Sequence, residues 1–187
     1  MEILIIKFRN IGDVLLSTPL ISNLKNIYPG SVIDFALNKG CEDMVSDNPN
    51  INNIIIYDRP RIKKLSLLSQ LKEEIRFTRN IRNNHYDMVI NLTEGDRGAQ
   101  LAFLSGASKK LGFPVRKGLL SKIKIFDKLG DDKKWQHTVE KDLQFINLLG
   151  KEVDNKEVKI YWPNKVEQEI DKILADNNID QFVHIHP

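Results

Sequence analysis

The sequence has almost no cysteine, the residue whose disulfides stabilise many small folds. Cys41 is the only cysteine among 187 residues, so we expect no internal disulfide and no cysteine-based metal cluster. Long apolar runs are lacking too, since none approaches the roughly 20 residues that a membrane-spanning helix needs. Residues 1–6 have neither the basic start nor the long apolar core of a signal peptide. With 41% hydrophobic and 28% charged residues, the composition is that of a globular protein, which we expect in the cytoplasm.

Glycine-rich phosphate-binding loops are missing as well. A dinucleotide-binding fingerprint needs three closely spaced glycines, and a P-loop needs Gly-Lys-Ser/Thr; neither follows the first apolar run. That run, residues 3–6, predicts a strand buried on both faces of a parallel sheet. Gly12 is expected to turn the chain, and helical spacing from Asp13 lasts until Pro29. Residues 7–13 would then lie at the carboxyl end of a strand, where open α/β sheets bind ligands.

The same alternation of strand and helix continues along the chain. It predicts right-handed βαβ units and a Rossmann-like α/β fold, with helices on both faces of a parallel sheet. Further strands are expected at residues 31–37, 54–57, 88–92 and 109–113, and helices at 39–45, 66–84, 99–104 and 138–149. Residues 116–134 are expected to be mostly loop. A linker at 150–161, a helix at 164–176 and the start of a strand at 182–187 would follow.

Asp13 is open to two interpretations. A carboxylate at a helix start can cap the helix or stand in its first turn, which contributes about 1 kcal/mol. The capping box is incomplete, however, because Leu16 stands where Glu or Gln would return the bond. At the ligand edge of a sheet, a carboxylate can instead serve as a general base. A phosphoacceptor receiver domain is disfavoured, because Arg9 and Asn10 occupy the place of its acidic, Mg²⁺-binding pair.

Positive charge gathers in two stretches. Residues 59–85 and 109–134 each carry a net charge of +6, and the rest of the chain carries −9. Such asymmetry suggests a polyanionic partner, although solvated lysine-rich surfaces are the alternative. Four of these residues follow the third strand in a loop at the ligand edge and suit phosphate groups: Arg59, Arg61, Lys63 and Lys64. Only Phe77 and Tyr86 interleave with the first stretch, which disfavours single-stranded nucleic acid as the partner.

Other polar residues are candidates with structural alternatives. Thr93, Asp96 and Arg97 follow the fourth strand and are candidate substrate contacts, while helix capping by Thr93 or Asp96 is equally open. His137 precedes a helix, and no second ligand has metal spacing to it. His184-Ile-His186 provides two imidazoles on one strand face, a weak metal signal, so no metal site is predicted.

Several of these segments resemble one family. The string KFRNIGDVLLSTP at residues 7–19 is similar to the N-terminus of bacterial ADP-heptose:lipopolysaccharide heptosyltransferases, glycosyltransferase family nine. Later landmarks agree: IIIYD at 54–58, YDMVINLT at 86–93 and HTVEKDL at 137–143. The resemblance spans the chain, and its most specific part is the Gly12-Asp13 loop.

The resemblance implies a two-lobed GT-B glycosyltransferase. Residues 1–150 would form the N-terminal, acceptor-binding lobe. Residues 151–187 would be the linker, helix and first strand of a nucleotide-sugar-binding lobe that is largely absent from this chain. The expected activity is inverting transfer of heptose from ADP-heptose to the lipopolysaccharide inner core, without cofactor or metal. Asp13 would be the catalytic base, and His137 would lie toward the cleft.

The remaining implications concern partners. Substrate contacts are expected from Lys7, Arg9, Asn10 and Gly12, together with the residues after the third and fourth strands. The partners would be a phosphorylated lipopolysaccharide core acceptor and the nucleotide-sugar donor. A peripheral position at the cytoplasmic face of the inner membrane is compatible with them. The alternative is a truncated, non-catalytic module that binds phosphorylated glycolipid or another polyanion, and nucleic-acid binding ranks third.

Overall fold

A six-stranded parallel sheet forms the centre of the protein. The computed structural model describes residues 1–116, 118–132 and 135–183, and the strands run in the order β3-β2-β1-β4-β5-β6. Every adjacent pair is parallel. The strands are β1 (Glu2–Lys7), β2 (Val32–Asn38), β3 (Asn53–Tyr57), β4 (Met88–Asn91), β5 (Lys109–Gly112) and β6 (Lys128–Leu129). The predicted Rossmann-like α/β fold is confirmed.

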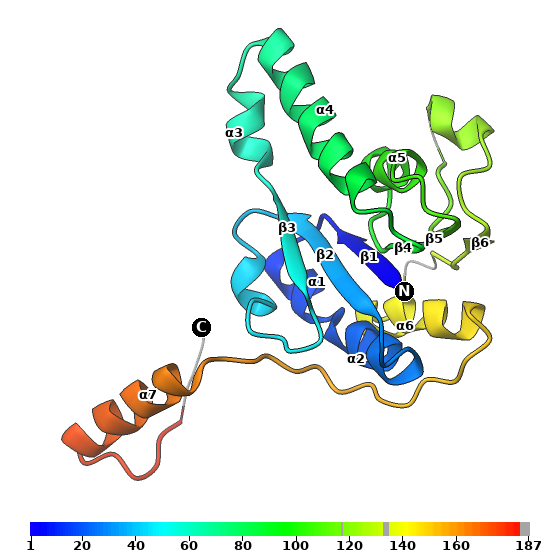
Figure 1. The fold of residues 1–187 in the computed structure, drawn as a ribbon. Helices are drawn as coiled ribbons and strands as arrows, with labels where there is room; N and C mark the ends of the chain where they lie inside the picture. Colours follow the sequence, from blue (N-terminus) through cyan, green and yellow to red (C-terminus); the bar gives the residue numbers. More distant parts are fainter. Residues whose placement is uncertain (117, 133–134, 184–187) are drawn as a thin grey trace.

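Helices cover both faces of this sheet (Figure 1). The helical elements are α1 (Ile11–Leu15), α2 (Thr18–Ile27), η1 (Glu42–Met44), α3 (Arg59–Lys63), α4 (Leu67–Asn83), α5 (Asp96–Leu104), η2 (Leu119–Lys122), α6 (Thr138–Leu148) and α7 (Asn164–Asp176). Helices α1, α2 and α6 pack on one face, and α4 and α5 pack on the other. Strand β1 is therefore buried on both sides, as its uninterrupted apolar run predicts.

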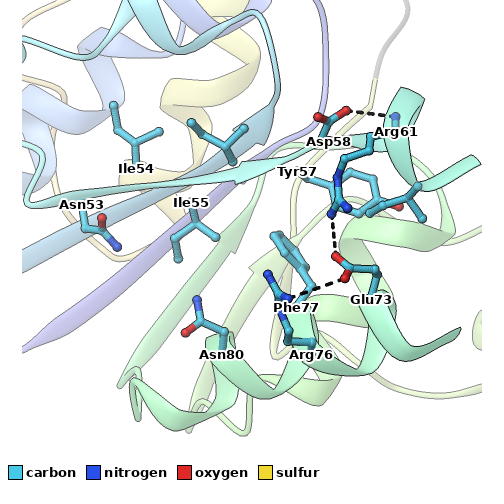
Figure 2. Close-up of a pocket in the computed structure, with 12 residues that line it drawn as sticks. Asn53, Ile54, Ile55, Tyr57, Asp58, Arg61, Glu73, Arg76, Phe77 and Asn80 are labelled. Atoms are coloured by element: carbon cyan, nitrogen blue, oxygen red, sulfur yellow. Dashed lines mark hydrogen bonds and ion pairs between the residues drawn. The ribbon is translucent and has the colours of Figure 1, made fainter. Parts of the chain in front are cut away.

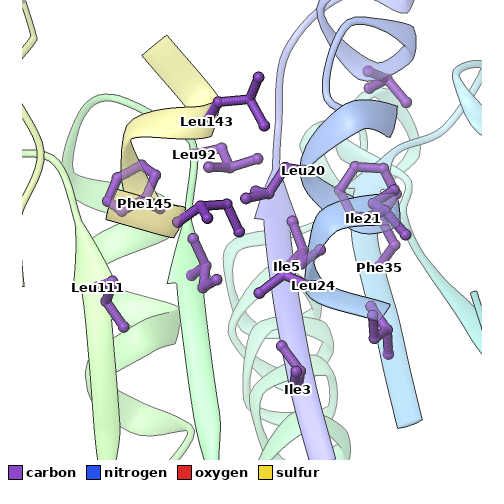
Figure 3. Close-up of a cluster of buried hydrophobic side chains, with 14 of the residues drawn as sticks. Ile3, Ile5, Leu20, Ile21, Leu24, Phe35, Leu92, Leu111, Leu143 and Phe145 are labelled. Carbon is purple, nitrogen blue, oxygen red and sulfur yellow. The ribbon is translucent and has the colours of Figure 1, made fainter. Parts of the chain in front are cut away.

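The alternation of side chains along the central strands divides the core into two layers. Ile3 and Ile5 join the layer beneath α2 and α6, in the same buried cluster as Leu24 and Phe145 (Figure 3). Leu4 and Ile6 point to the opposite layer. Because successive side chains point to opposite faces, a strand that is apolar at every position needs a helix layer on each side.

The strand order reverses direction between β1 and β4. The chain builds outward from β1 through β2 to β3, then returns to β4 and continues to β5 and β6. In open α/β sheets, ligands bind in the crevice outside the carboxyl ends of the strands at such a switch point. The loop after β1 and the loop after β4 flank it here.

The first helix differs from the prediction. Two helices, α1 and α2, replace the single expected one, and α1 begins before Asp13. Pro19 explains the break, because it has no amide hydrogen to continue the ladder of hydrogen bonds from the preceding turn. Gly12 consequently lies inside α1, and residues 8–10 make the turn, contrary to our expectation.

The segment after β3 was also wrongly predicted. Residues 59–63, expected to be a loop, form α3. The carboxylate of Asp58 accepts a hydrogen bond from the backbone N–H of Arg61 (3.0 Å), and Pro60 stands in the first turn, where its fixed φ suits a helix. In the second basic stretch, the short strand β6 and η2 occur where loop was expected.

The C-terminal segment stands apart from the sheet (Figure 1). Residues 150–163 contain no helix or strand, as predicted for a linker, and α7 matches its expected bounds. The side chain of Asn23 holds the linker against α2, accepting a hydrogen bond from the backbone N–H of Asp154 (2.7 Å) and donating one to the carbonyl of Asn155 (2.6 Å). Residues 182–183 are not strand, and the rest of that predicted strand, with His184 and His186, lies outside the described residues. The assignment of residues 151–187 to a second lobe stays a prediction.

Among the helices of the described residues, none combines the length and apolar character required to cross a bilayer.

Candidate active site

Direct hydrogen bonds join the loops after β1 and β4. The hydroxyl of Thr93 accepts a hydrogen bond from the backbone N–H of Phe8 at 2.7 Å. The buried side chain of Asn91 accepts from the N–H of Thr93 (3.1 Å) and donates to its carbonyl (2.9 Å). A Cβ at Gly98 would lie only 2.1 Å from Oδ1 of Asn91, so a glycine there lets α5 approach β4. Thr93, a candidate substrate contact, is thus buried and joins the two loops.

Asp13 stands beside this junction with an unengaged carboxylate. Asn10 occupies the N-cap position of α1, so Asp13 is the third helical residue and belongs to its first turn. Within the described residues, no hydrogen bond or ion pair reaches its side chain, which is partly exposed. Of the two structural roles that the sequence left open, the structure shows the first-turn position and not the cap. The carboxylate itself has no partner among the described residues.

The backbone conformation at position 12, next to Asp13, does not require a glycine. Its φ lies outside the left-handed region, and a Cβ added there would meet no described atom within 4 Å. Glycine inside a helix costs roughly 1 kcal/mol relative to alanine, so a glycine without a local structural need is unfavourable for folding. It leaves open space beside Asp13 at the ligand edge of the sheet.

Charged side chains continue the site toward β5. Glu94 pairs with Arg9 (3.2 Å) through one oxygen and with Lys141 of α6 through the other. The hydrogen bond from Lys141 lowers the pKa of Glu94 below its usual value. Glu94 and Lys141 border a pocket of about 680 Å³ at the carboxyl ends of β4 and β5. Its lining residues are Glu94, Gly95, Asp96, Pro114, Arg116, Asp132 and Lys141.

A buried ion pair supports the site from beneath. Lys7, an expected substrate contact, is only 3% exposed, and its Nζ lies 2.7 Å from Oδ2 of Asp142 on α6. Burial, with a smaller contribution from the charge of Asp13, raises the pKa of Asp142 to about 6 against the opposing effect of Lys7. Asp142 was missed in the sequence, although one signal was present: it interrupts the apolar stripe of Val139, Leu143 and Ile146.

Arg97 is held by Tyr57 and Glu74. Its guanidinium carbon lies 3.5 Å from the centroid of the Tyr57 ring, and its Nη2 lies 2.7 Å from Oε2 of Glu74 on α4. The Tyr57 hydroxyl donates to the other oxygen of Glu74 (2.5 Å). Burial of the Tyr57 hydroxyl, together with its hydrogen bond to Glu74, raises the pKa of Tyr57 to about 12. Arg97 therefore locks α5 against β3 and α4.

The basic residues of α3 form a separate group at the same edge. Arg61 borders a pocket of about 500 Å³ between β3 and the α3–α4 pair, and it is held by Glu73 at 2.6 Å (Figure 2). Arg59, Lys63 and Lys64 are exposed, and the described residues offer them no ion-pair partner. Because β3 is two strands from β1, the structure does not bring this group into contact with Asp13.

The remaining candidates are helix ends. His137 is exposed and caps α6, its Nδ1 accepting a hydrogen bond from the backbone N–H of Val139 (3.3 Å). Asp96 begins α5 and borders the pocket next to Glu94. In the described part of the chain, no group of three or more His, Cys, Asp or Glu side chains is arranged to hold a metal ion.

Comparison with known proteins identifies the family. A family model described as glycosyltransferase family 9 (heptosyltransferase) matches residues 74–180, more than half of the chain. The chain belongs to glycosyltransferase family 9. The resemblance to this family is thereby confirmed, and the matched residues include the landmarks at 86–93 and 137–143. The string at 7–19 and the landmark at 54–58 lie outside the matched residues.

Curated relatives of this family-9 chain are longer than it is. Lipopolysaccharide heptosyltransferase 3 of Escherichia coli (strain K12) is 37% identical over 83 residues, which are 44% of this chain and 23% of the relative. Lipopolysaccharide heptosyltransferase 2 of the same strain is 27% identical over 130 residues, 68% of this chain and 36% of the relative. The matched segments thus span about a quarter to a third of these relatives.

Solved structures share the fold. A family 9 glycosyl transferase from Veillonella parvula DSM 2008 has a TM-score of 0.74 at 21% identity, covering 95% of this chain and 49% of the other. E. coli heptosyltransferase WaaC with ADP-2-deoxy-2-fluoro heptose has a TM-score of 0.71 at 21% identity, covering 96% and 67%. At this identity the likeness supports the fold of the family-9 chain and leaves its substrate to be argued from the site.

Proposed function

We propose that this chain is the acceptor-binding lobe of an inverting glycosyltransferase that transfers heptose from ADP-heptose to the lipopolysaccharide inner core. The observation that carries the proposal is the free carboxylate of Asp13 at the switch point between β1 and β4, in a chain of glycosyltransferase family 9. Open space at Gly12 beside it leaves room for a sugar to approach.

Asp13 would act as the general base in a single displacement. The acceptor hydroxyl oxygen forms a bond to the anomeric carbon of heptose while the bond from that carbon to the diphosphate oxygen breaks. The electron pair leaves with ADP, and the hydroxyl proton passes to Asp13. Because the hydroxyl becomes acidic only as the new bond forms, a carboxylate that is a weak base toward a free alcohol can accept the proton late in the step. Attack from the face opposite the leaving group inverts the anomeric centre.

Basic side chains supply the recognition of negative charge. Arg59, Lys63 and Lys64 on α3 are exposed and can bind acceptor phosphates, and bidentate pairing favours arginine there. Most contacts with the departing diphosphate would come from a second lobe beyond this chain. The proposal requires no metal, and it places the protein in the cytoplasm with its nucleotide-sugar donor.

The test compares two neutralised carboxylates in the full-length protein. Asp13→Asn keeps the shape of the side chain and removes the base, so we expect the transfer rate to fall about 10²- to 10⁴-fold with acceptor binding nearly unchanged. Glu152→Gln, exposed just beyond the end of α6, is the matched control and should transfer heptose at the wild-type rate. Transfer is measured as ADP release with a heptose-deficient core acceptor.

Each result distinguishes the proposal from its alternative. An Asp13→Asn enzyme that keeps the wild-type rate would remove Asp13 as the base. A full-length wild-type protein that binds the phosphorylated core without releasing ADP would support the non-catalytic binding module instead. Loss of core binding in a variant with Arg59, Lys63 and Lys64 all changed to alanine would place the acceptor at α3, and unchanged binding would exclude that placement.

A further inference from the structure

The first half of α4 exposes an apolar surface. Leu67, Leu68, Leu71 and Ile75 are 82%, 76%, 58% and 57% exposed. The sequence predicts an apolar face from Leu67, Leu71 and Ile75, and such a face normally packs on a core. In the structure the helix packs on the sheet through its later residues, chiefly Ile81 and Phe77, so the predicted face is left in solvent.

Basic residues lie directly beside this apolar surface. At about 100° per residue, the four apolar side chains occupy an arc of roughly 100° around the helix axis. Lys72, Arg76 and Arg79 occupy the next roughly 60°, and Arg82 continues the surface two turns beyond Ile75. All four basic side chains are exposed. The helix therefore has a leucine-rich strip bordered by positive charge.

The acidic side chains of α4 do not neutralise this strip. Glu73 turns toward α3 and pairs with Arg61 at 2.6 Å, and Glu74 turns toward the sheet, where Tyr57 and Arg97 hold it. Arg76 also approaches Glu73, at 3.6 Å. Within the described residues, Lys72, Arg79 and Arg82 have no ion-pair partner. Three positive charges next to exposed leucines thus remain unbalanced.

The strip continues into a groove between α4 and α5. The groove has a volume of about 480 Å³, with Leu71 and Ile75 on one side and Leu101 and Leu104 on the other. Arg79 and Arg82 also line it. Apolar walls combined with arginines suit a molecule that has a hydrocarbon part and an anionic head.

We propose that the exposed face of α4, defined by Leu67, Leu68, Leu71, Ile75, Lys72, Arg79 and Arg82, binds the surface of an anionic lipid bilayer. An interfacial helix buries a Leu-rich face at the boundary of headgroups and acyl chains, while Lys and Arg attract anionic lipid. Helix α7 also exposes apolar residues, Val166, Ile170 and Ile173, but acidic residues accompany them, including Glu167, Glu169 and Asp171. Positive charge thus distinguishes the α4 face.

The position of the face in the fold gives the contact a direction. Helix α4 follows β3 and α3, so its first turns lie at the carboxyl edge of the sheet, and Figure 1 shows them extending beyond the strands with α3. A bilayer bound there would lie at the same edge as Asp13. This inference goes beyond the proposed function, because it concerns plain lipid and needs neither donor nor glycolipid acceptor.

Vesicle flotation with the 187-residue chain tests the apolar half of the face. The vesicles contain either phosphatidylcholine alone or phosphatidylcholine with phosphatidylglycerol, and no glycolipid. We expect binding to the anionic vesicles only, weakened at least about tenfold by Leu68→Ser with Leu71→Ser. Ile170→Ser with Ile173→Ser removes two comparably exposed residues from α7 and should leave binding unchanged. Equal loss in both double variants would overturn the proposal.

A second variant tests the basic residues of the α4 face. Lys72→Gln with Arg79→Gln should weaken binding to anionic vesicles about tenfold or more, because each basic residue near an anionic surface contributes to attraction. Both residues are exposed, so this variant keeps the test valid if the leucine variant does not fold. Retention of full binding by the charge variant would overturn the proposal. So would a wild-type dimer in sedimentation that the leucine variant separates, since a second copy would then occupy the face.

Discussion

Lys7 at the end of β1 and Asp142 on α6 form a buried ion pair, with 2.7 Å between Nζ and Oδ2, although the two residues are 135 positions apart in the chain. The second carboxylate oxygen lies 3.0 Å from the same nitrogen. Both side chains are nearly inaccessible to water. The pair attaches α6 to the strand that leads to Asp13, so it couples the packing of the lobe to the geometry of the candidate active site.

Breaking this pair on one side is expected to destabilise the protein. In Asp142→Leu, the ammonium of Lys7 stays buried without a partner, which costs about 3–5 kcal/mol of unfolding free energy. The double variant Lys7→Met with Asp142→Leu removes both charges and should recover most of that loss. Urea unfolding followed by circular dichroism measures both values. If the double variant is no more stable than Asp142→Leu, the pair would stabilise the fold through more than the neutralisation of one buried charge by the other.

The same carboxyl gives a dependence of stability on pH. Burial raises the pKa of Asp142 in the folded protein from 3.8 to about 6, so between these values the folded state binds more protons than the unfolded state. Stability from this group therefore falls as the pH rises from about 4 to about 6, by at most about 3 kcal/mol. Asp142→Asn lacks the titrating group, so the difference in unfolding free energy between wild type and variant should show this slope. A difference that is flat or rises with pH would contradict it.

Replacing Gly12 by alanine is expected to raise stability and to lower activity. Alanine has the higher helix propensity and meets no described atom here, so Gly12→Ala is expected to raise the unfolding free energy by up to about 1 kcal/mol. Under the proposed function, the added methyl group occupies space beside Asp13 and lowers the rate of heptose transfer. Thermal unfolding and ADP release by the full-length enzyme measure the two effects. A variant that is more stable and equally active would show that the space at Gly12 is not used.

Thr93 is expected to matter first for structure. Its hydroxyl accepts the hydrogen bond from the backbone of Phe8, and Thr93→Val leaves that N–H without a partner at a loss of about 1–3 kcal/mol. Thr93→Ser keeps the hydroxyl and is the matched control, so it should lose clearly less. Guanidinium unfolding compares the three proteins. Equal losses in the Val and Ser variants would place the effect in the methyl packing rather than in the hydrogen bond.

Much of this fold could be predicted from local patterns. Apolar strands separated by helical spacing indicated a parallel α/β sheet, and the loop after the first strand was correctly placed at the ligand edge. Two local signals were missed, and both come from prolines. Pro19 divides the first predicted helix into α1 and α2, and Pro60 stands in the first turn of α3. The short strand β6 had no such signal, because its two residues become strand only by pairing with β5.

The sequence by itself determined which residues are apolar, where strands and helices alternate, and which family the chain resembles, because these depend on spacing along the chain. Only the tertiary structure decided what each polar residue does. Lys7 pairs with Asp142, and Arg97 is bound to Glu74, whereas Asp13 has no side-chain partner among the residues that the structure describes. The partners of Lys7 and Arg97 come from distant segments, and electrostatic energy depends on distance and burial in space rather than on order in the sequence.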